Sequence, residues 1–254
     1  MKISVLTVCY NSENTIRDTI TSVLSQKNVD IEYIIIDGGS SDRTCEIVSE
    51  YTDSIRYFVS EEDNGVYDGF NKGIKLCSGD VLSILNSDDV FHDEYVLFDI
   101  LNAFQDSKAD IVIGDLLYVR RDNLMKIERI WRCGPFIQGA FVRGWHPPHP
   151  AFFVTQKVYS EYLNFNLNYK FAADFVVMHE LLEIQKIKSH YINRNCIKMR
   201  LGGLTSKNLY NVWLGNLEIS RYLSKQYKDF RPIIYLSKRL VPKLLDKLCQ
   251  KFHN

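Results

Sequence analysis

The pattern that most restricts the fold of this chain is an alternation of apolar and amphipathic segments over roughly its first hundred residues. Short runs rich in Val, Ile and Leu, typical of buried strands, are each followed by apolar residues at helical spacing. Strands that alternate with helices favour crossover connections, and therefore a parallel sheet with helices on both faces. The expected strands are 3–9, 31–36, 55–59 and 81–85, and the expected helices are 14–25, 41–51, 66–76 and 94–104.

Polar residues stand where each expected strand ends. They are Tyr10-Asn11, Asp37, Glu61-Glu62-Asp63 and Asn86-Ser87-Asp88-Asp89. Parallel sheets bind ligands at the carboxyl ends of their strands, so these groups are expected to converge on one rim. The adjacent carboxylates of Asp88 and Asp89 disfavour each other unless a cation compensates, and oxygen ligands suit Mg²⁺ or Mn²⁺. A solvated acidic turn is the alternative.

The second half of the chain has a different rhythm. It predicts a hairpin of strands 110–119 and 125–131, an irregular aromatic and Pro-rich segment at 136–154, a helix at 174–184 and a strand near 189–193. The glycines of MRLGGLTS predict a mobile loop at 199–206. We therefore divide the chain into a domain at 1–206, with a first half at 1–105 and a second half at 106–206, and a C-terminal region at 207–254.

The C-terminal region is basic although the whole chain has a formal net charge of zero. From Arg221 onward there are nine Lys or Arg residues against two Asp or Glu residues. An apolar helical stripe and a basic stripe run side by side there, comprising Leu236, Leu240, Val241, Leu244, Leu245, Leu248 and Phe252, and Arg239, Lys243, Lys247 and Lys251. A basic amphipathic helix suggests docking on an anionic membrane surface, whereas packing on the body of the protein is the alternative.

Other features of the sequence restrict its location and partners. The N-terminal apolar run is too short for a signal peptide, and no stretch reaches the length of a membrane span. The six cysteines form no CxxC pair, which favours a reducing cytosol. Bulk charge predicts no nucleic-acid partner. The dinucleotide fingerprint and the P-loop pattern are both missing, which argues against dehydrogenases and kinases.

Three long blocks resemble the amino-terminal half of family 2 glycosyltransferases, which have the GT-A fold. The blocks are LTVCYNSENTIRDTITSVLSQ, YIIIDGGSSDRT and SEEDNGVYDGFNKGIKLCSGDVLSILNSDDVF. Their order and spacing match over about residues 1–105, and the form is similar to bacterial transferases that build O-antigen, colanic-acid-like and capsular repeat units. The fold implied is a Rossmann-like, mostly parallel nucleotide-binding sheet with helices on both faces and a helical C-terminal extension.

The resemblance implies roles for individual residues. Thr7, Tyr10 and Asn11 match positions that line the base pocket, and Asp37 matches a carboxylate that contacts uracil or ribose. Asn71 and Lys72 match a segment near the nucleotide sugar, where a lysine meets phosphate. Asp88 and Asp89 match the motif that holds the metal and its diphosphate, with Asp89 slightly preferred as the ligand. Many members of the family have Asp where this chain has Asn86, so metal binding leans on the following pair.

An inverting transferase needs a general base for the acceptor hydroxyl. Asp174, in NYKFAADFVV, resembles the acid that has this role in the family, whereas its residue type and position alone favour a helix-start acid. Trp145, His146 and His149 in GWHPPHPAFF are candidates for contacts with the acceptor or the diphosphate, or else form a rigid aromatic loop. Gly202 and Gly203, with residues 204–206, match a loop that closes over the donor.

These observations together predict an inverting, metal-dependent glycosyltransferase. It would move a hexose or N-acetylhexosamine from a nucleotide sugar, expected to be UDP-linked, to a polyprenyl-diphosphate-linked saccharide at the cytoplasmic face of the membrane, in bacterial surface-polysaccharide synthesis. The alternatives are a sugar nucleotidyltransferase, which would need a Gly-rich basic loop after the first strand, and a non-catalytic carbohydrate-binding protein. The joint presence of Asp37, Asp88, Asp89 and Asp174 argues against the second alternative.

Overall fold

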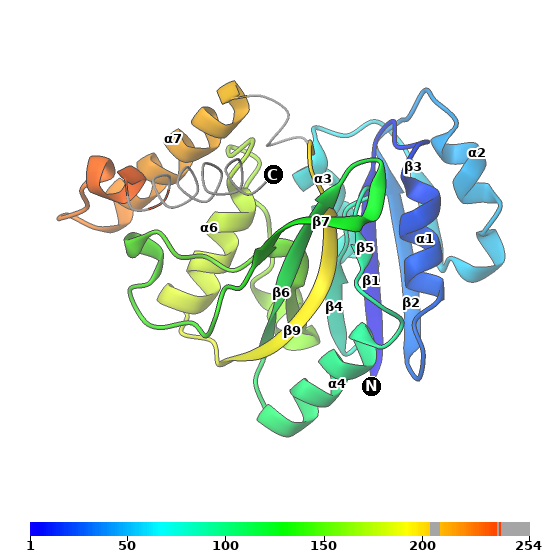
Figure 1. The fold of residues 1–254 in the computed structure, drawn as a ribbon, viewed down its shortest axis with the longest axis horizontal. Coiled ribbons are helices and arrows are strands. Elements are labelled where there is room, and N and C mark those ends of the chain that lie inside the picture. The colour runs from blue at the N-terminus through cyan, green and yellow to red at the C-terminus, as the bar shows by residue number, and fades with distance from the viewer. Residues whose placement is uncertain (204–208, 238, 240–254) are drawn as a thin grey trace.

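A single mixed β-sheet forms the centre of the protein in the computed structural model, which describes residues 1–203, 209–237 and 239 (Figure 1). Its strand order is β3-β2-β1-β4-β8-β6-β9-β5, with β7 paired to β6. The strands are β1 (Lys2–Cys9), β2 (Asp30–Asp37), β3 (Tyr57–Ser60), β4 (Val81–Ile84), β5 (Val90–Phe91), β6 (Ile111–Arg120), β7 (Asn123–Trp131), β8 (Phe152–Thr155) and β9 (Ser189–Arg200).

The helices cover both faces of this sheet, as the alternating pattern predicts. They are α1 (Ile16–Leu24), α2 (Thr44–Ser49), α3 (Val66–Ile74), α4 (Val96–Ser107), α5 (Gln156–Glu161), α6 (Ala173–His179) and α7 (Leu209–Gln226). Successive side chains of a strand point to opposite faces. Val5 and Ile35 accordingly pack with α1, α2 and α4, whereas Leu6 and Ile36 pack with α3 and α6. The α/β fold class is therefore confirmed.

The first half of the chain supplies the parallel part of the sheet. β1 pairs in parallel with β2 and β4, and β2 pairs in parallel with β3, so the polar residues that follow these strands emerge at one edge. The second half is mixed, because β8 joins β4 and β6 in antiparallel pairs whereas β9 runs parallel to β6. Since β5 also pairs with β9, the two halves share one continuous sheet.

Two glycines set how closely α3 approaches the sheet. A Cβ atom on Gly69 would lie 2.5 Å from Val8 Cγ1, and one on Gly73 would lie 2.2 Å from Leu6 Cδ1. Because these positions are four residues apart, they form one face of α3, which packs directly on β1. This close packing fixes the position of α3, and of its other side chains, relative to the sheet.

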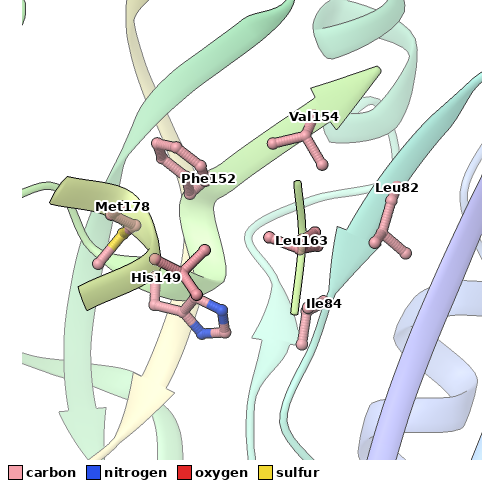
Figure 2. Close-up of a pocket in the computed structure, with 8 residues that line it drawn as sticks. Leu82, Ile84, His149, Phe152, Val154, Leu163 and Met178 are labelled. Atoms are coloured by element: carbon pink, nitrogen blue, oxygen red, sulfur yellow. The ribbon is translucent and has the colours of Figure 1, made fainter. Parts of the chain in front are cut away.

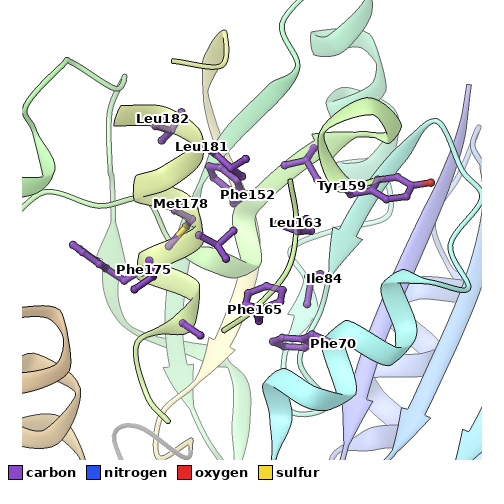
Figure 3. Close-up of a cluster of buried hydrophobic side chains, with 14 of the residues drawn as sticks. Phe70, Ile84, Phe152, Tyr159, Leu163, Phe165, Phe175, Met178, Leu181 and Leu182 are labelled. Carbon is purple, nitrogen blue, oxygen red and sulfur yellow. The ribbon is translucent and has the colours of Figure 1, made fainter. Parts of the chain in front are cut away.

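A cluster of aromatic and aliphatic side chains joins α3 to α6 (Figure 3). Phe70 of α3 and Phe165 of the loop before α6 have ring centroids 5.2 Å apart. Beyond its last α-helical residue, α6 continues as a π-helical segment, Glu180–Ile184. The predicted helix at 174–184 and the predicted hairpin are both confirmed, whereas β5, β8 and α5 are elements that the sequence pattern missed.

Candidate active site

The loops that follow β1, β2 and β4 meet at the predicted rim. The hydroxyl oxygens of Ser12 and Ser87 lie 2.8 Å apart, and the Ser41 backbone N–H donates to Asn11 Oδ1 at 2.9 Å. Asn11 has a φ of 46°, in the left-handed region that asparagine tolerates better than most residues. The turn places Tyr10 at the surface, where 62% of it is exposed.

Asp37 ends β2 as a fully buried carboxylate. Its Oδ2 accepts hydrogen bonds from the backbone N–H groups of Gly39 and Ser40 at 3.1 and 2.9 Å, and from the Ser60 hydroxyl at 2.7 Å. Burial opposes its ionisation, but these hydrogen bonds outweigh that cost and lower its pKa. The carboxylate therefore shapes the loop after β2, and its contact with a base or ribose hydroxyl stays a prediction.

Thr7 lies deeper than the rim. It is fully buried, and its hydroxyl oxygen is 3.2 Å from that of Tyr33 inside the sheet. Of the three residues predicted to line a base pocket, the structure thus brings Tyr10 and Asn11 to the surface and places Thr7 in the core.

Asp89 is the buried member of the acidic pair, with 1% of the residue exposed. Its Oδ1 accepts a hydrogen bond from the Arg200 backbone N–H at 3.2 Å, and its Oδ2 accepts one from the Asn86 side-chain amide at 2.9 Å. Burial and then the charge of Asp88 raise its pKa well above the ordinary value. Asn86 therefore has a structural use here, because an ionised aspartate at 86 could not donate this hydrogen bond.

Asp88 is the accessible member of the pair. Its side chain is 24% exposed, and its Oδ2 lies 3.8 Å from Nη1 of Arg121 in the β6–β7 turn. Gly203 lies near the same oxygen, because a Cβ atom on Gly203 would be 3.6 Å from Asp88 Oδ2. Burial raises the pKa of Asp88, and the charge of Arg121 opposes that effect.

These residues fit a hard divalent cation only in one way. The described residues hold no group of three or more acids, histidines or cysteines suited to a metal. Mg²⁺ commonly takes one or two carboxylates and completes its shell with water and substrate phosphates. Asp88, whose side chain is 24% exposed, fits that arrangement, whereas both oxygens of Asp89 already accept hydrogen bonds.

Arg200, at the end of β9, fixes this corner of the rim. Its side chain is 4% exposed; its Nη1 donates to the Asp88 carbonyl at 2.7 Å and its Nε donates to the Arg121 carbonyl at 3.2 Å. Its Nη2 forms an ion pair with Asp18 of α1. The guanidinium thus joins the loop after β4 to α1 and to the β6–β7 turn.

Asp174 lies in the first turn of α6. Its Oδ1 accepts hydrogen bonds from the Tyr67 hydroxyl at 3.1 Å and the Phe175 backbone N–H at 2.8 Å. Burial and the Asp174 charge raise the pKa of Tyr67 well above its usual value, so Tyr67 stays a neutral donor. Oδ2 of Asp174 accepts no hydrogen bond from the part of the chain that the structure describes.

The aromatic segment before β8 gathers behind the start of α6. Trp145 donates its indole N–H to the Cys133 carbonyl at 2.6 Å, and the ring of His146 lies 5.8 Å from that of Phe175. His149 lines a small pocket of about 10 Å³ with Phe152, Leu163 and Met178 (Figure 2). Burial lowers its pKa, so the imidazole is neutral. Acceptor contacts by Trp145, His146 and His149 stay predictions.

Asn71 and Lys72 point in different directions from α3. Both amide atoms of Asn71 are used, because Nδ2 donates to the Phe165 carbonyl and Oδ1 accepts from the Phe165 N–H, each at 2.8 Å. The Lys72 ammonium lies 2.9 Å from Glu61 and donates to the Glu62 carbonyl at 3.0 Å. A phosphate near Lys72 would therefore compete with Glu61.

Tyr67, Arg121 and Arg200 are site residues that the sequence analysis did not identify. Tyr67 lies in SEEDNGVYDGFNKG and Arg200 lies in MRLGGLTS, two segments that the sequence already linked to the site. Arg121 lies in a polar turn, where residue type alone gives no indication of a role.

Comparison with known proteins agrees with this geometry. A family model described as "Glycosyl transferase family 2" matches residues 4–161. An uncharacterized glycosyltransferase of Mycobacterium tuberculosis (strain ATCC 25618 / H37Rv) is 31% identical over 174 residues, which are 68% of this chain and 65% of that protein. Poly-beta-1,6-N-acetyl-D-glucosamine synthase of Staphylococcus epidermidis is 35% identical over 115 residues, which are 44% of this chain and 28% of the synthase. The matches thus span less than two thirds of each relative.

Solved structures share the fold at low identity. TarS of S. aureus (residues 1–349, in complex with UDP-GlcNAc) has a TM-score of 0.63 and 16% identity, covering 94% of this chain and 70% of that one. The mannosyltransferase PcManGT of Pyrobaculum calidifontis, in complex with GDP-Man and Mn²⁺, has a TM-score of 0.65 and 14% identity, covering 94% and 69%. At these identities the likeness shows the GT-A type of fold alone.

Proposed function

The chain belongs to glycosyltransferase family 2, and from this membership we propose that it transfers a hexose or N-acetylhexosamine from a nucleotide sugar with inversion. The observation that carries the proposal is that two acids, Asp174 and Asp88, stay accessible while neighbouring groups hold them in place. Oδ2 of Asp174 accepts no hydrogen bond from the described residues while Tyr67 donates to Oδ1, and the Asp88 side chain stays 24% exposed while Asn86 and Arg200 donate to Asp89. A degenerate binding protein would not need to keep either acid accessible to a ligand.

We propose a UDP-linked donor and a Mn²⁺ or Mg²⁺ ion held by Asp88. Relatives support the donor class, since one is named a poly-N-acetylglucosamine synthase and a protein of the same fold is solved with UDP-GlcNAc. Another protein of this fold is solved with Mn²⁺ and GDP-Man. Asp88 would hold the divalent ion, and the ion would supply Lewis-acid stabilisation of the departing diphosphate.

In the proposed reaction, Asp174 acts as the general base. Its Oδ2 accepts the proton of an acceptor hydroxyl while that oxygen forms a bond to the anomeric carbon of the donor. The bond from this carbon to the diphosphate oxygen breaks on the opposite side, and the nucleoside diphosphate leaves with the electron pair. Tyr67 fixes the carboxylate plane through Oδ1, so that Oδ2 faces the acceptor.

We further propose that the acceptor is a polyprenyl-diphosphate-linked saccharide of a bacterial surface polysaccharide and that the protein is peripheral on the membrane. None of the helices among the described residues has the length and apolarity that a membrane span requires. The outer face of α7 supports docking: Tyr210 and Trp213 are 64% and 58% exposed, and the basic residues Arg221 and Lys225 continue the same face. Aromatic and cationic side chains together suit an anionic membrane interface. Of the stripes predicted at 236–252, Leu236 packs partly buried against the core and the Arg239 guanidinium lies 5.5 Å from the ring centroid of Phe175. The members from 240 onward lie outside the described residues.

Release of nucleoside diphosphate tests the transferase. The protein would be incubated with each nucleotide sugar and Mn²⁺, with and without a lipid-linked saccharide mimic. We expect acceptor-dependent diphosphate release that Asp174→Asn reduces by about a hundredfold or more, in line with typical general-base contributions. The exposed Asp53→Asn substitution is the matched control. Pyrophosphate formation from a nucleoside triphosphate would instead support the nucleotidyltransferase, and unchanged turnover in Asp174→Asn would refute the base assignment.

Vesicle co-sedimentation tests the membrane proposal. Truncation at residue 221 would remove Tyr222 and Tyr227, which contact His179 of α6, so surface substitutions are the sharper tool. We expect a variant with both Tyr210→Ser and Trp213→Ser to bind phosphatidylglycerol vesicles several-fold more weakly than the wild type. Equal binding of this variant and the wild type would refute a role for the outer face of α7.

A further inference from the structure

A polar groove of about 540 Å³ lies between α3 and α6, the helix that carries the candidate base, and has no role in the reaction described above. Its walls are α3, the loop before α6, and α6 with its π-helical continuation. The volume falls within the range of about 300–1,000 Å³ that small-molecule sites occupy. We propose that this groove binds the saccharide part of the acceptor, so that it is a subsite for sugar residues beyond the one that reacts. This inference rests on the proposed transferase function.

The lining of the groove has the chemistry of sugar recognition. Asn164 and Asn166 offer amides, Tyr162 offers a hydroxyl and Glu180 offers a carboxylate, and all four residues are exposed. Side-chain amides both donate and accept hydrogen bonds, which matches neighbouring hydroxyl groups. Tyr162, 42% exposed, and Leu167, 49% exposed, provide apolar surface for the C–H face of a pyranose ring.

Several of these polar groups are available to a ligand. The Asn164 amide, the Tyr162 hydroxyl and the Glu180 carboxylate form no hydrogen bond with another side chain or backbone group within residues 1–203, 209–237 and 239. None of the described lining residues is cationic, so the groove does not suit a diphosphate or a phospholipid headgroup. A neutral polyhydroxylated ligand satisfies both conditions.

The floor of the groove is rigid and touches the residue that holds the base. Phe165 lines the groove and is fixed to α3 by its two hydrogen bonds with Asn71. Its ring stacks on that of Tyr67 at a centroid distance of 5.5 Å and an interplanar angle of 15°. Tyr67 donates to Asp174 from the other side. Figure 3 shows Phe165 next to Phe70, between α3 and the helix that bears Phe175.

Binding can be measured without turnover. Saturation-transfer NMR would be recorded with glucose, galactose and N-acetylglucosamine, each as a monosaccharide and as a trisaccharide. We expect at least one trisaccharide to bind the wild type, and Tyr162→Ala combined with Asn164→Ala to weaken that binding at least tenfold. Tyr95→Ala is the matched control, because Tyr95 is 41% exposed and immediately precedes α4, which does not line the groove. Absence of saturation transfer from every trisaccharide, or equal binding by the groove variant and the wild type, would overturn the inference.

Transfer kinetics separate this inference from the proposed function. With acceptors of one and three sugar residues, we expect the longer acceptor to have a lower KM, and the groove variant to lose that advantage while keeping the rate with the short acceptor. A length preference retained in the groove variant would refute the subsite and leave the transferase intact. Absence of transfer from any donor would refute the transferase, and the NMR measurement would then still decide whether the groove binds sugar.

Discussion

The contact between α6 and α7 depends on a neutral histidine and should fail in acid. His179 is fully buried, and its Nδ1 and Nε2 lie 2.8 and 2.9 Å from the hydroxyl oxygens of Tyr222 and Tyr227. Burial lowers its pKa from 6.5 to about 4. Between these values the unfolded chain binds a proton that the folded chain does not, so stability is complete above pH 6.5 and is lost as the pH falls towards 4.

The size of this effect follows from the two pKa values. At pH 5 the linkage relation gives a loss of about 2 kcal/mol relative to pH 7.5, which corresponds to a decrease of about 4–8 °C in Tm for a chain of this size. Urea unfolding at pH 7.5, 6.5, 5.5 and 5.0 would measure it in the wild type and in His179→Gln. The glutamine can still bond to both tyrosines but does not titrate, so the difference between the two slopes isolates His179. Identical pH dependence in both proteins would refute the reasoning.

Three further outcomes are expected at the rim. Arg200→Met leaves the carbonyls of Asp88 and Arg121 without their donor and should cost about 1–3 kcal/mol in unfolding free energy, with Arg200→Lys recovering part of it; equal urea midpoints for Arg200→Met and the wild type would contradict this role. Tyr67→Phe should lower kcat about tenfold with little change in the KM of the nucleotide sugar, because a hydrogen bond to a charged group is worth about 1.5–3 kcal/mol; a change confined to KM would show that Tyr67 does not position the base. Asp88→Asn should weaken Mn²⁺-dependent binding of UDP-sugar in calorimetric titrations, whereas Asp89→Asn should mainly lower stability, by about 1–3 kcal/mol; the reverse result would make Asp89 the ligand.

The first half of the fold was predictable because its elements are local and strongly patterned. The strand at 3–9 and the helix at 66–76 are confirmed within two residues at each end, since continuous apolar runs and helical spacing both reflect burial on a two-faced sheet. The carboxyl-end convergence of Asn11, Asp37 and Asp88 followed from the parallel topology alone.

The second half was less predictable because its elements depend on partners far away in the chain. β8 pairs with β4 across about seventy residues, and β9 extends to Arg200 rather than ending near 193. The additional part of β9 carries charged residues whose ion-pair partners lie far away in the sequence. Arg194, for example, pairs with Asp93 and Asp99. The role of Asp89 was similarly hidden, because its hydrogen-bond donor from Arg200 comes from a strand 111 residues later.

The shared sheet has a consequence for engineering and for evolution. Since β4 pairs with β8 and β5 pairs with β9, a cut between residues 105 and 106 would leave unpaired strand edges on both fragments. Such edges recruit other chains, so each fragment alone is expected to aggregate rather than fold. Donor and acceptor preferences are therefore expected to change through exchange of the surface loops at 10–15 or 162–168, which leave every strand pair intact, and not through recombination of whole halves.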